Sequence, residues 1–146
     1  MPGPTYSALP GALKRLIHFV ALAALLTGIA WMALHFASQG WIDEELSRRA
    51  QVYLLKIHGA AAMLALVALG MLLSTHILPA LKNPPNRGAG IALLAGIASL
   101  TLTGWGLYYL GDEKLRGWTS DIHIAVGLAA VAVFTYHIRY RKRAAN

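Results

Sequence analysis

The chain has 146 residues, of which 57% are hydrophobic and only 13% are charged, and it contains no cysteine. A soluble domain usually carries about 25% charged residues, so much of this surface is expected to face something other than water. The absence of cysteine excludes disulfides, thiolate metal sites and covalently attached haem of the c type. The formal net charge of +7 does not indicate nucleic acid, because the basic residues stand at the ends of apolar runs instead of along one face with aromatic residues.

Four apolar stretches, taken in chain order, predict four membrane-spanning helices. They cover about residues 16–37, 52–75, 90–110 and 122–138, and each is near the ~20 residues that a helix needs to cross ~30 Å of hydrocarbon. The first is too long for a cleavable signal peptide, and no small-residue cleavage site follows it. Short connections make neighbouring helices antiparallel. The predicted fold is therefore all-α, an up-down-up-down four-helix transmembrane bundle forming one domain over residues 1–146, with no sequence repeat.

The distribution of charge predicts how the bundle is oriented. Eight of the thirteen lysines and arginines lie on the side of the two termini, and the other side carries five of them together with all six acidic residues. The positive-inside rule places the termini in the cytoplasm. The four tryptophans lie near the outer ends of the predicted helices, as an interfacial aromatic belt would; they are Trp31, Trp41, Trp105 and Trp118.

Six histidines need an explanation, because ionisable groups at membrane depth are costly; they are His18, His35, His58, His76, His123 and His137. A single histidine near a helix end could simply reach interfacial water. His123 and His137, however, are fourteen residues apart, which separates them by ~21 Å along the axis but by only about 40° in direction. Gly127 lies between them on that face. It would leave room for a flat macrocycle, although small residues also serve close helix packing.

The remaining helices offer histidines at matching depths. His58, near the start of the second helix, is level with His123, and His18, near the start of the first, is level with His137. Small residues follow both faces, and Gly28 is expected on the face of His18. Two histidines that ligate one haem iron saturate its axial positions, which suits electron transfer.

One histidine in the first helix, one in the second and an H-x13-H pair in the last resemble the bacterial cytochrome b561 superfamily over all four helices. That group includes the b-type cytochrome subunits of formate dehydrogenases and nickel–iron hydrogenases, and the small stand-alone cytochromes b561. The resemblance implies two haem b groups, the outer one held by His58 and His123 and the inner one by His18 and His137. It also implies a multi-pass protein of the bacterial inner membrane, with a quinone as one partner and a periplasmic electron carrier or dehydrogenase subunit as the other.

Four further residues have open roles. Lys56 and Arg139 stand two residues from His58 and His137 and could serve haem propionates, or they could be charges that set topology. His76 could replace His18 as a ligand, contact a quinone beside the inner haem, or be an interfacial bystander. His35 points about 100° away from His18 and is expected to be a bystander.

The expected function is therefore that of a di-haem b cytochrome, an oxidoreductase component that moves electrons across the membrane to or from the quinone pool. A variant is a self-contained superoxide:ubiquinone oxidoreductase of the cytochrome b561 type. Alternatives of another class are a histidine-based metal-ion carrier and a cofactor-free structural subunit. Metal-ion sites usually add carboxylates or thiolates, and no Asp or Glu is expected at mid-membrane depth here.

Overall fold

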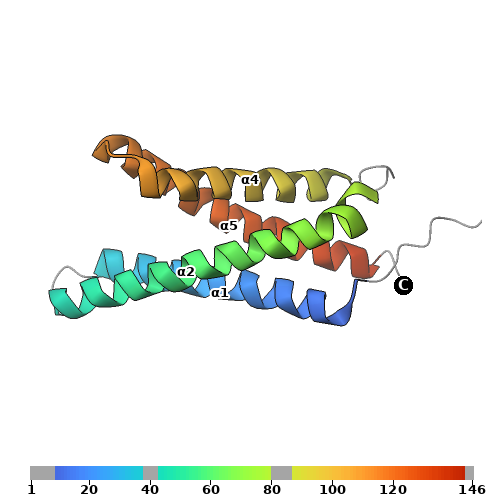
Figure 1. The fold of residues 1–146 in the computed structure, drawn as a ribbon, viewed down its shortest axis with the longest axis horizontal. Helices are drawn as coiled ribbons and strands as arrows, with labels where there is room; N and C mark the ends of the chain where they lie inside the picture. Colours follow the sequence, from blue (N-terminus) through green and yellow to red (C-terminus); the bar gives the residue numbers. More distant parts are fainter. Residues whose placement is uncertain (1–8, 38–42, 80–86, 144–146) are drawn as a thin grey trace, which may run out of the picture. The chain divides into compact units, whose positions relative to one another are not determined.

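The computed structural model describes residues 9–37, 43–79 and 87–143, and within them it contains helices and no strand. Two helices precede residue 80, α1 (Gly11–Ala37) and α2 (Glu44–Leu72), and a π-helical turn, η1 (Leu73–Ile77), continues α2. The other two are α4 (Arg87–Tyr109) and α5 (Glu113–Arg143) (Figure 1). The all-helical prediction is confirmed, and Trp41 lies outside the described residues.

All four helices are long and apolar enough to cross a membrane. Their large apolar side chains point outward: Phe19 is 66% exposed, Met63 is 72% exposed and Leu102 is 69% exposed. In water such exposure would be costly, whereas lipid tails are as apolar as these side chains. The chain thus has helices of the length, and an apolar surface of the kind, that a multi-pass membrane protein has, as the apolar runs predict.

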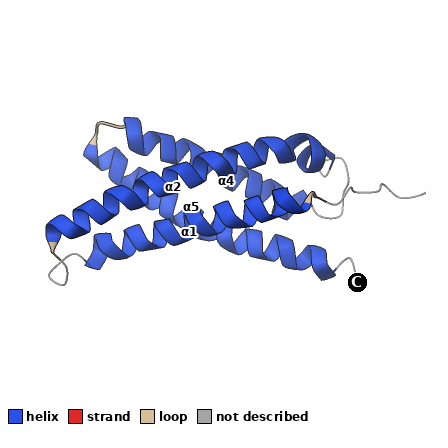
Figure 2. Cartoon of the chain, turned by 60° about the horizontal axis from the view of Figure 1, so that its bottom comes forward, coloured by secondary structure: helices blue, strands red, loops and turns tan. Residues whose placement is uncertain are grey.

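The chain forms two compact units, residues 1–79 and residues 80–146. The first unit, here called the first hairpin, pairs α1 with α2, and the second hairpin pairs α4 with α5. In each unit the two helices run antiparallel and side by side (Figures 1 and 2). Val20, Ala61 and Ala68 are buried in the first hairpin, and the small alanines allow the two helix backbones to approach closely.

Both second helices of the hairpins begin at an aspartate cap. Asp43 Oδ1 accepts a hydrogen bond from the Leu46 amide at 2.9 Å, and Asp112 Oδ1 accepts one from the Leu115 amide at 2.8 Å. Each cap satisfies an amide that has no partner within the first helical turn. As a result α2 and α5 begin at residues 44 and 113, eight and nine residues before the predicted apolar runs. The helix starts predicted at residues 52 and 122 are too late, because hydropathy does not identify the polar first turns of a helix.

The caps generate a stability prediction. Replacing Asp112 with Ala should lower the free energy of unfolding by about 1 kcal/mol, because the amide of Leu115 loses its acceptor. Asp112→Ser keeps a good capping side chain and is the matched control. Thermal unfolding of both variants in detergent, followed by circular dichroism, measures the difference. Equal stability of the alanine and serine variants would show that the cap does not hold the start of α5.

Candidate functional site

His58 of α2 contacts α1 through its Nδ1 atom. This nitrogen lies 3.0 Å from Thr27 Oγ1 and 3.0 Å from the carbonyl oxygen of Ala24. A carbonyl oxygen only accepts hydrogen bonds, so Nδ1 is assigned the ring proton. The Thr27 hydroxyl donates to the Ala23 carbonyl at 2.6 Å, which leaves its oxygen as an acceptor for the same N–H. In the neutral ring the lone pair is then on Nε2.

His123 of α5 has the same kind of partner in the second hairpin. Its Nδ1 lies 2.8 Å from Thr103 Oγ1 of α4. The Thr103 hydroxyl donates to the Ser99 carbonyl at 2.7 Å, so the oxygen accepts and the histidine nitrogen donates. The proton is again assigned to Nδ1 and the lone pair to Nε2. Two histidines that the sequence singles out thus share one tautomer and one mode of support.

A glycine follows each of these threonines and lies against the imidazole ring. A Cβ atom placed on Gly28 would stand 3.4 Å from His58 Cε1, and one placed on Gly104 would stand 3.5 Å from His123 Cε1. Each ring therefore packs against a helix backbone that has no side chain at that point. The contact of Gly28 with the ring of His58 was not predicted, and its expected place on the face of His18 stays a prediction.

The two hairpins share a sequence pattern that the prediction of no repeat overlooked. Each has Leu-Thr-Gly in its first helix, Asp-Glu-x-Leu at the start of its second helix, and Ile-His further along that helix. The copies are Leu26-Thr27-Gly28, Asp43-Glu44-Glu45-Leu46 and Ile57-His58, and then Leu102-Thr103-Gly104, Asp112-Glu113-Lys114-Leu115 and Ile122-His123. The repeated Thr-Gly pair was the signal that would have identified Thr27 and Thr103 as partners of the histidines.

The repeat is hard to recognise in the sequence because its motifs are spaced differently in the two hairpins. The capping aspartate precedes the histidine by fifteen residues in α2 and by eleven residues in α5. The difference of four residues is close to one helical turn of 3.6 residues. Both histidines therefore stand on nearly the same helical face relative to their caps, and each meets the threonine of its own hairpin.

The other two predicted ligands, His18 and His137, lie outside the repeat. His18 is exposed, and its Nδ1 lies 2.6 Å from the Lys14 carbonyl oxygen one turn earlier in α1, so its lone pair is also assigned to Nε2. His137 is half-buried on α5. That helix is unbroken from Glu113 to Arg143, which is the condition for the predicted ~21 Å rise and near-common face of His123 and His137.

The remaining predicted residues have various surroundings. His76 is half-buried within η1, and a π-helical turn changes the 100° step by which the sequence placed His76 on the face of His58. His35 stacks on Trp31 with ring centroids 4.8 Å apart and planes 11° apart, as an aromatic group at a helix end. Gly127 faces Leu100 of α4, since a Cβ atom there would stand 3.8 Å from Leu100 Cδ2, which favours helix packing at this position.

The two basic residues predicted to serve haem propionates are both exposed. Lys56 stands two positions from His58 and hence about 200° around α2, and its ammonium group lies 5.4 Å from the centroid of the Tyr53 ring. The propionate roles of Lys56 and Arg139 stay predictions. Among the described residues, no three or more His, Cys, Asp or Glu side chains gather as a metal-ion site would need.

Comparison with models of protein families, with curated proteins and with solved structures finds no match to this chain. The structure brings each of His58 and His123 together with a threonine and a glycine of its own hairpin. Each predicted haem-ligand pair combines one histidine of the first hairpin with one of the second. The pairing therefore stays a prediction.

The glycine contact can be tested with a matched pair of substitutions in the first hairpin. Gly28→Leu should lower the free energy of unfolding by about 1–3 kcal/mol, because the new side chain would occupy the space of the His58 ring. Gly70→Leu is the control, since a Cβ atom there meets nothing within 4 Å. Denaturant titration of both variants in mixed micelles measures the effect. If Gly28→Leu is as stable as Gly70→Leu, the ring does not pack where the structure places it.

Proposed function

We propose that this chain is a di-haem b-type cytochrome of the bacterial inner membrane, with both termini in the cytoplasm. It transfers electrons between a donor or partner subunit on the periplasmic side and the quinone pool. His58 and His123 ligate the outer haem, and His18 and His137 ligate the inner one. The resemblance of the histidine pattern to the cytochrome b561 superfamily and the excess of basic residues on the side of the termini support this proposal.

The observation that carries the proposal is the state of the histidine rings. His18, His58 and His123 each direct Nδ1–H to an oxygen acceptor. A histidine that ligates a metal through Nε2 characteristically donates its other N–H to a carbonyl or a comparable acceptor, which fixes both tautomer and ring orientation. The Nε2 lone pairs of these histidines fit a haem iron, which takes neutral imidazole ligands at its two axial positions.

The residues of each hairpin have separate parts in this arrangement. Bound haem would supply reversible one-electron chemistry at iron. Thr27 and the Ala24 carbonyl hold the ring of His58, and Thr103 holds the ring of His123. The donated Nδ1–H raises the basicity of Nε2 and so strengthens it as a ligand. Gly28 and Gly104 leave the rings close to the neighbouring backbone, where a larger side chain would push them away.

Haem content is the first test. The full-length protein, purified in detergent from cells with ample haem supply, should contain about two haem b per chain in a pyridine haemochrome assay. His58→Ala, His123→Ala and the double variant should each lose the same single haem, because both residues serve one site. His35→Ala is the control and should keep both haems, since its ring stacks on Trp31. A folded wild-type protein without haem would end the proposal, and additive losses in the double variant would refute the pairing.

The threonine supports predict a second, finer effect. Thr103→Val removes the acceptor of the His123 N–H at nearly constant volume, whereas Thr103→Ser retains a hydroxyl. Loss of such a supporting hydrogen bond typically lowers metal affinity by about 10–100-fold. Haem transfer to an excess of apomyoglobin should therefore be faster from the valine variant than from the serine variant. Equal transfer from both variants would mean that the Thr103 hydroxyl does not support a haem ligand.

A further inference from the structure

The start of α2 extends beyond the length that hydrocarbon can cover. The apolar helical span from Glu44 to Ile77 has 34 residues, or ~51 Å at 1.5 Å per residue. The hydrocarbon core is ~30 Å thick, and the whole bilayer with its headgroups is ~40–45 Å thick. The apolar run of residues 52–75 is ~36 Å long and fills the core when the helix is tilted, so the segment from residue 44 to residue 56 covers the headgroup region and its boundary with the hydrocarbon.

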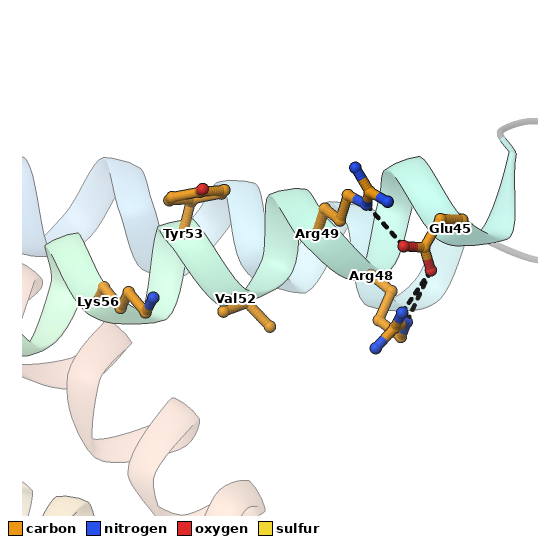
Figure 3. A pocket seen from close by; sticks show the side chains of 6 residues that line it. All are labelled: Glu45, Arg48, Arg49, Val52, Tyr53 and Lys56. Atoms are coloured by element: carbon orange, nitrogen blue, oxygen red, sulfur yellow. Dashed lines mark hydrogen bonds and ion pairs between the residues drawn. The ribbon is translucent and has the colours of Figure 1, made fainter.

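A shallow groove on this segment is predominantly basic (Figure 3). It is lined by Glu45, Arg48, Arg49, Val52, Tyr53 and Lys56. Three cations face one carboxylate, which leaves two positive charges in excess. Asp43 caps the helix and Glu44 is exposed in the first turn; neither is part of the lining, so the excess of positive charge is local to the groove.

Glu45 bridges the two arginines, whose guanidinium groups lie on either side of its carboxylate (Figure 3). Its Oε2 atom accepts from Arg48 Nε at 3.0 Å and also from Arg48 Nη2, while Oε1 accepts from Arg49 Nε at 2.6 Å. The side chains of Arg48 and Arg49 are 73% and 70% exposed. Because Arg49 reaches Glu45 through Nε, both of its terminal nitrogens are left for another acceptor. A planar guanidinium in this state suits two oxygens of one phosphate group.

The opposite end of the groove combines a cation with apolar surface. Lys56 makes no ion pair among the described residues, and its ammonium lies 5.4 Å from the centroid of the Tyr53 ring. Val52 and Tyr53 are 45% and 65% exposed between the arginines and Lys56. A ligand with a charged phosphate and an apolar body would contact both kinds of surface, whereas a free ion would leave Val52 and Tyr53 uncovered.

We propose that this groove binds the headgroup of an anionic phospholipid in the leaflet in which α2 begins. Arg48 and Arg49 contact the phosphate oxygens, Lys56 contributes a third positive charge, and Val52 and Tyr53 contact the glycerol and upper acyl region. The depth of the groove along α2 places it among headgroups, and its excess charge selects anionic over zwitterionic lipid. Binding of the lipid at this groove does not require bound haem.

Native mass spectrometry of the delipidated full-length protein tests the assignment. The wild-type protein, incubated with phosphatidylglycerol or phosphatidylcholine, should retain the anionic lipid preferentially. Arg49→Gln/Lys56→Gln should weaken phosphatidylglycerol binding about tenfold or more. The matched control is Lys114→Gln/Arg116→Gln, which removes two exposed charges from the early turns of α5 and should bind as the wild-type protein does. Circular dichroism establishes that each variant is helical.

Several results would overturn the proposal. Equal retention of the two lipids by the wild-type protein would do so without any variant, and so would equal weakening in both double variants, because attraction would then be non-specific. Binding of inorganic phosphate without binding of phosphatidylglycerol would refute the assignment to a lipid. Haem is measured on the same samples. Loss of haem from Arg49→Gln/Lys56→Gln with lipid binding intact would favour the propionate role of Lys56 instead.

Discussion

Hydrocarbon supplies no hydrogen-bonding partners, and this constraint governs the polar groups in the membrane-spanning parts of the four helices. The helical backbone satisfies its own amides and carbonyls, and the threonines follow the same rule. All six threonines in the described part of the chain donate their hydroxyl to a carbonyl one turn earlier; they are Thr27, Thr75, Thr101, Thr103, Thr119 and Thr135. Once that proton is committed, the hydroxyl oxygen can only accept. Thr27 and Thr103 use this oxygen to accept a hydrogen bond from a histidine ring and so orient the imidazole. The support of the histidines therefore follows from the lack of hydrogen-bonding partners in lipid.

Apolar runs were sufficient to predict the four helices, because the requirement for ~20 lipid-compatible residues is summed over a whole segment and tolerates local exceptions. The ends of the helices depend on single residues, and there hydropathy failed. Asp43 and Asp112 begin α2 and α5 well before the lipid-compatible stretch. The π-helical turn η1 was also missed, since one extra residue per turn between Leu73 and Ile77 leaves no trace in composition or periodicity.

The histidines of the candidate site could be selected from the sequence because their cost in a membrane makes each of them conspicuous. Their supports could not be selected in that way. A threonine or a glycine within an apolar run is unremarkable, and Thr27 and Thr103 acquire meaning only when the neighbouring helix brings a ring nitrogen to within 3.0 and 2.8 Å. Depth along a helix predicts which histidines share a level, but contact within each hairpin is set by the rotation of one helix against the other.

The unequal spacing of the two repeats has a consequence for how such hairpins can vary. A histidine that must contact a threonine on the adjacent helix tolerates insertions before it only if they add about whole helical turns. Such insertions leave the side chain pointing in nearly the same direction. One added residue would turn the ring by about 100°, whereas four turn it by about 40° and raise the helix start by ~6 Å. The length of the second helix is in effect quantised in whole turns. The first hairpin has one such turn more than the second between cap and histidine, and this segment of α2 carries Arg48, Arg49 and Lys56. One additional helical turn thus gives two otherwise similar hairpins different first segments in their second helices.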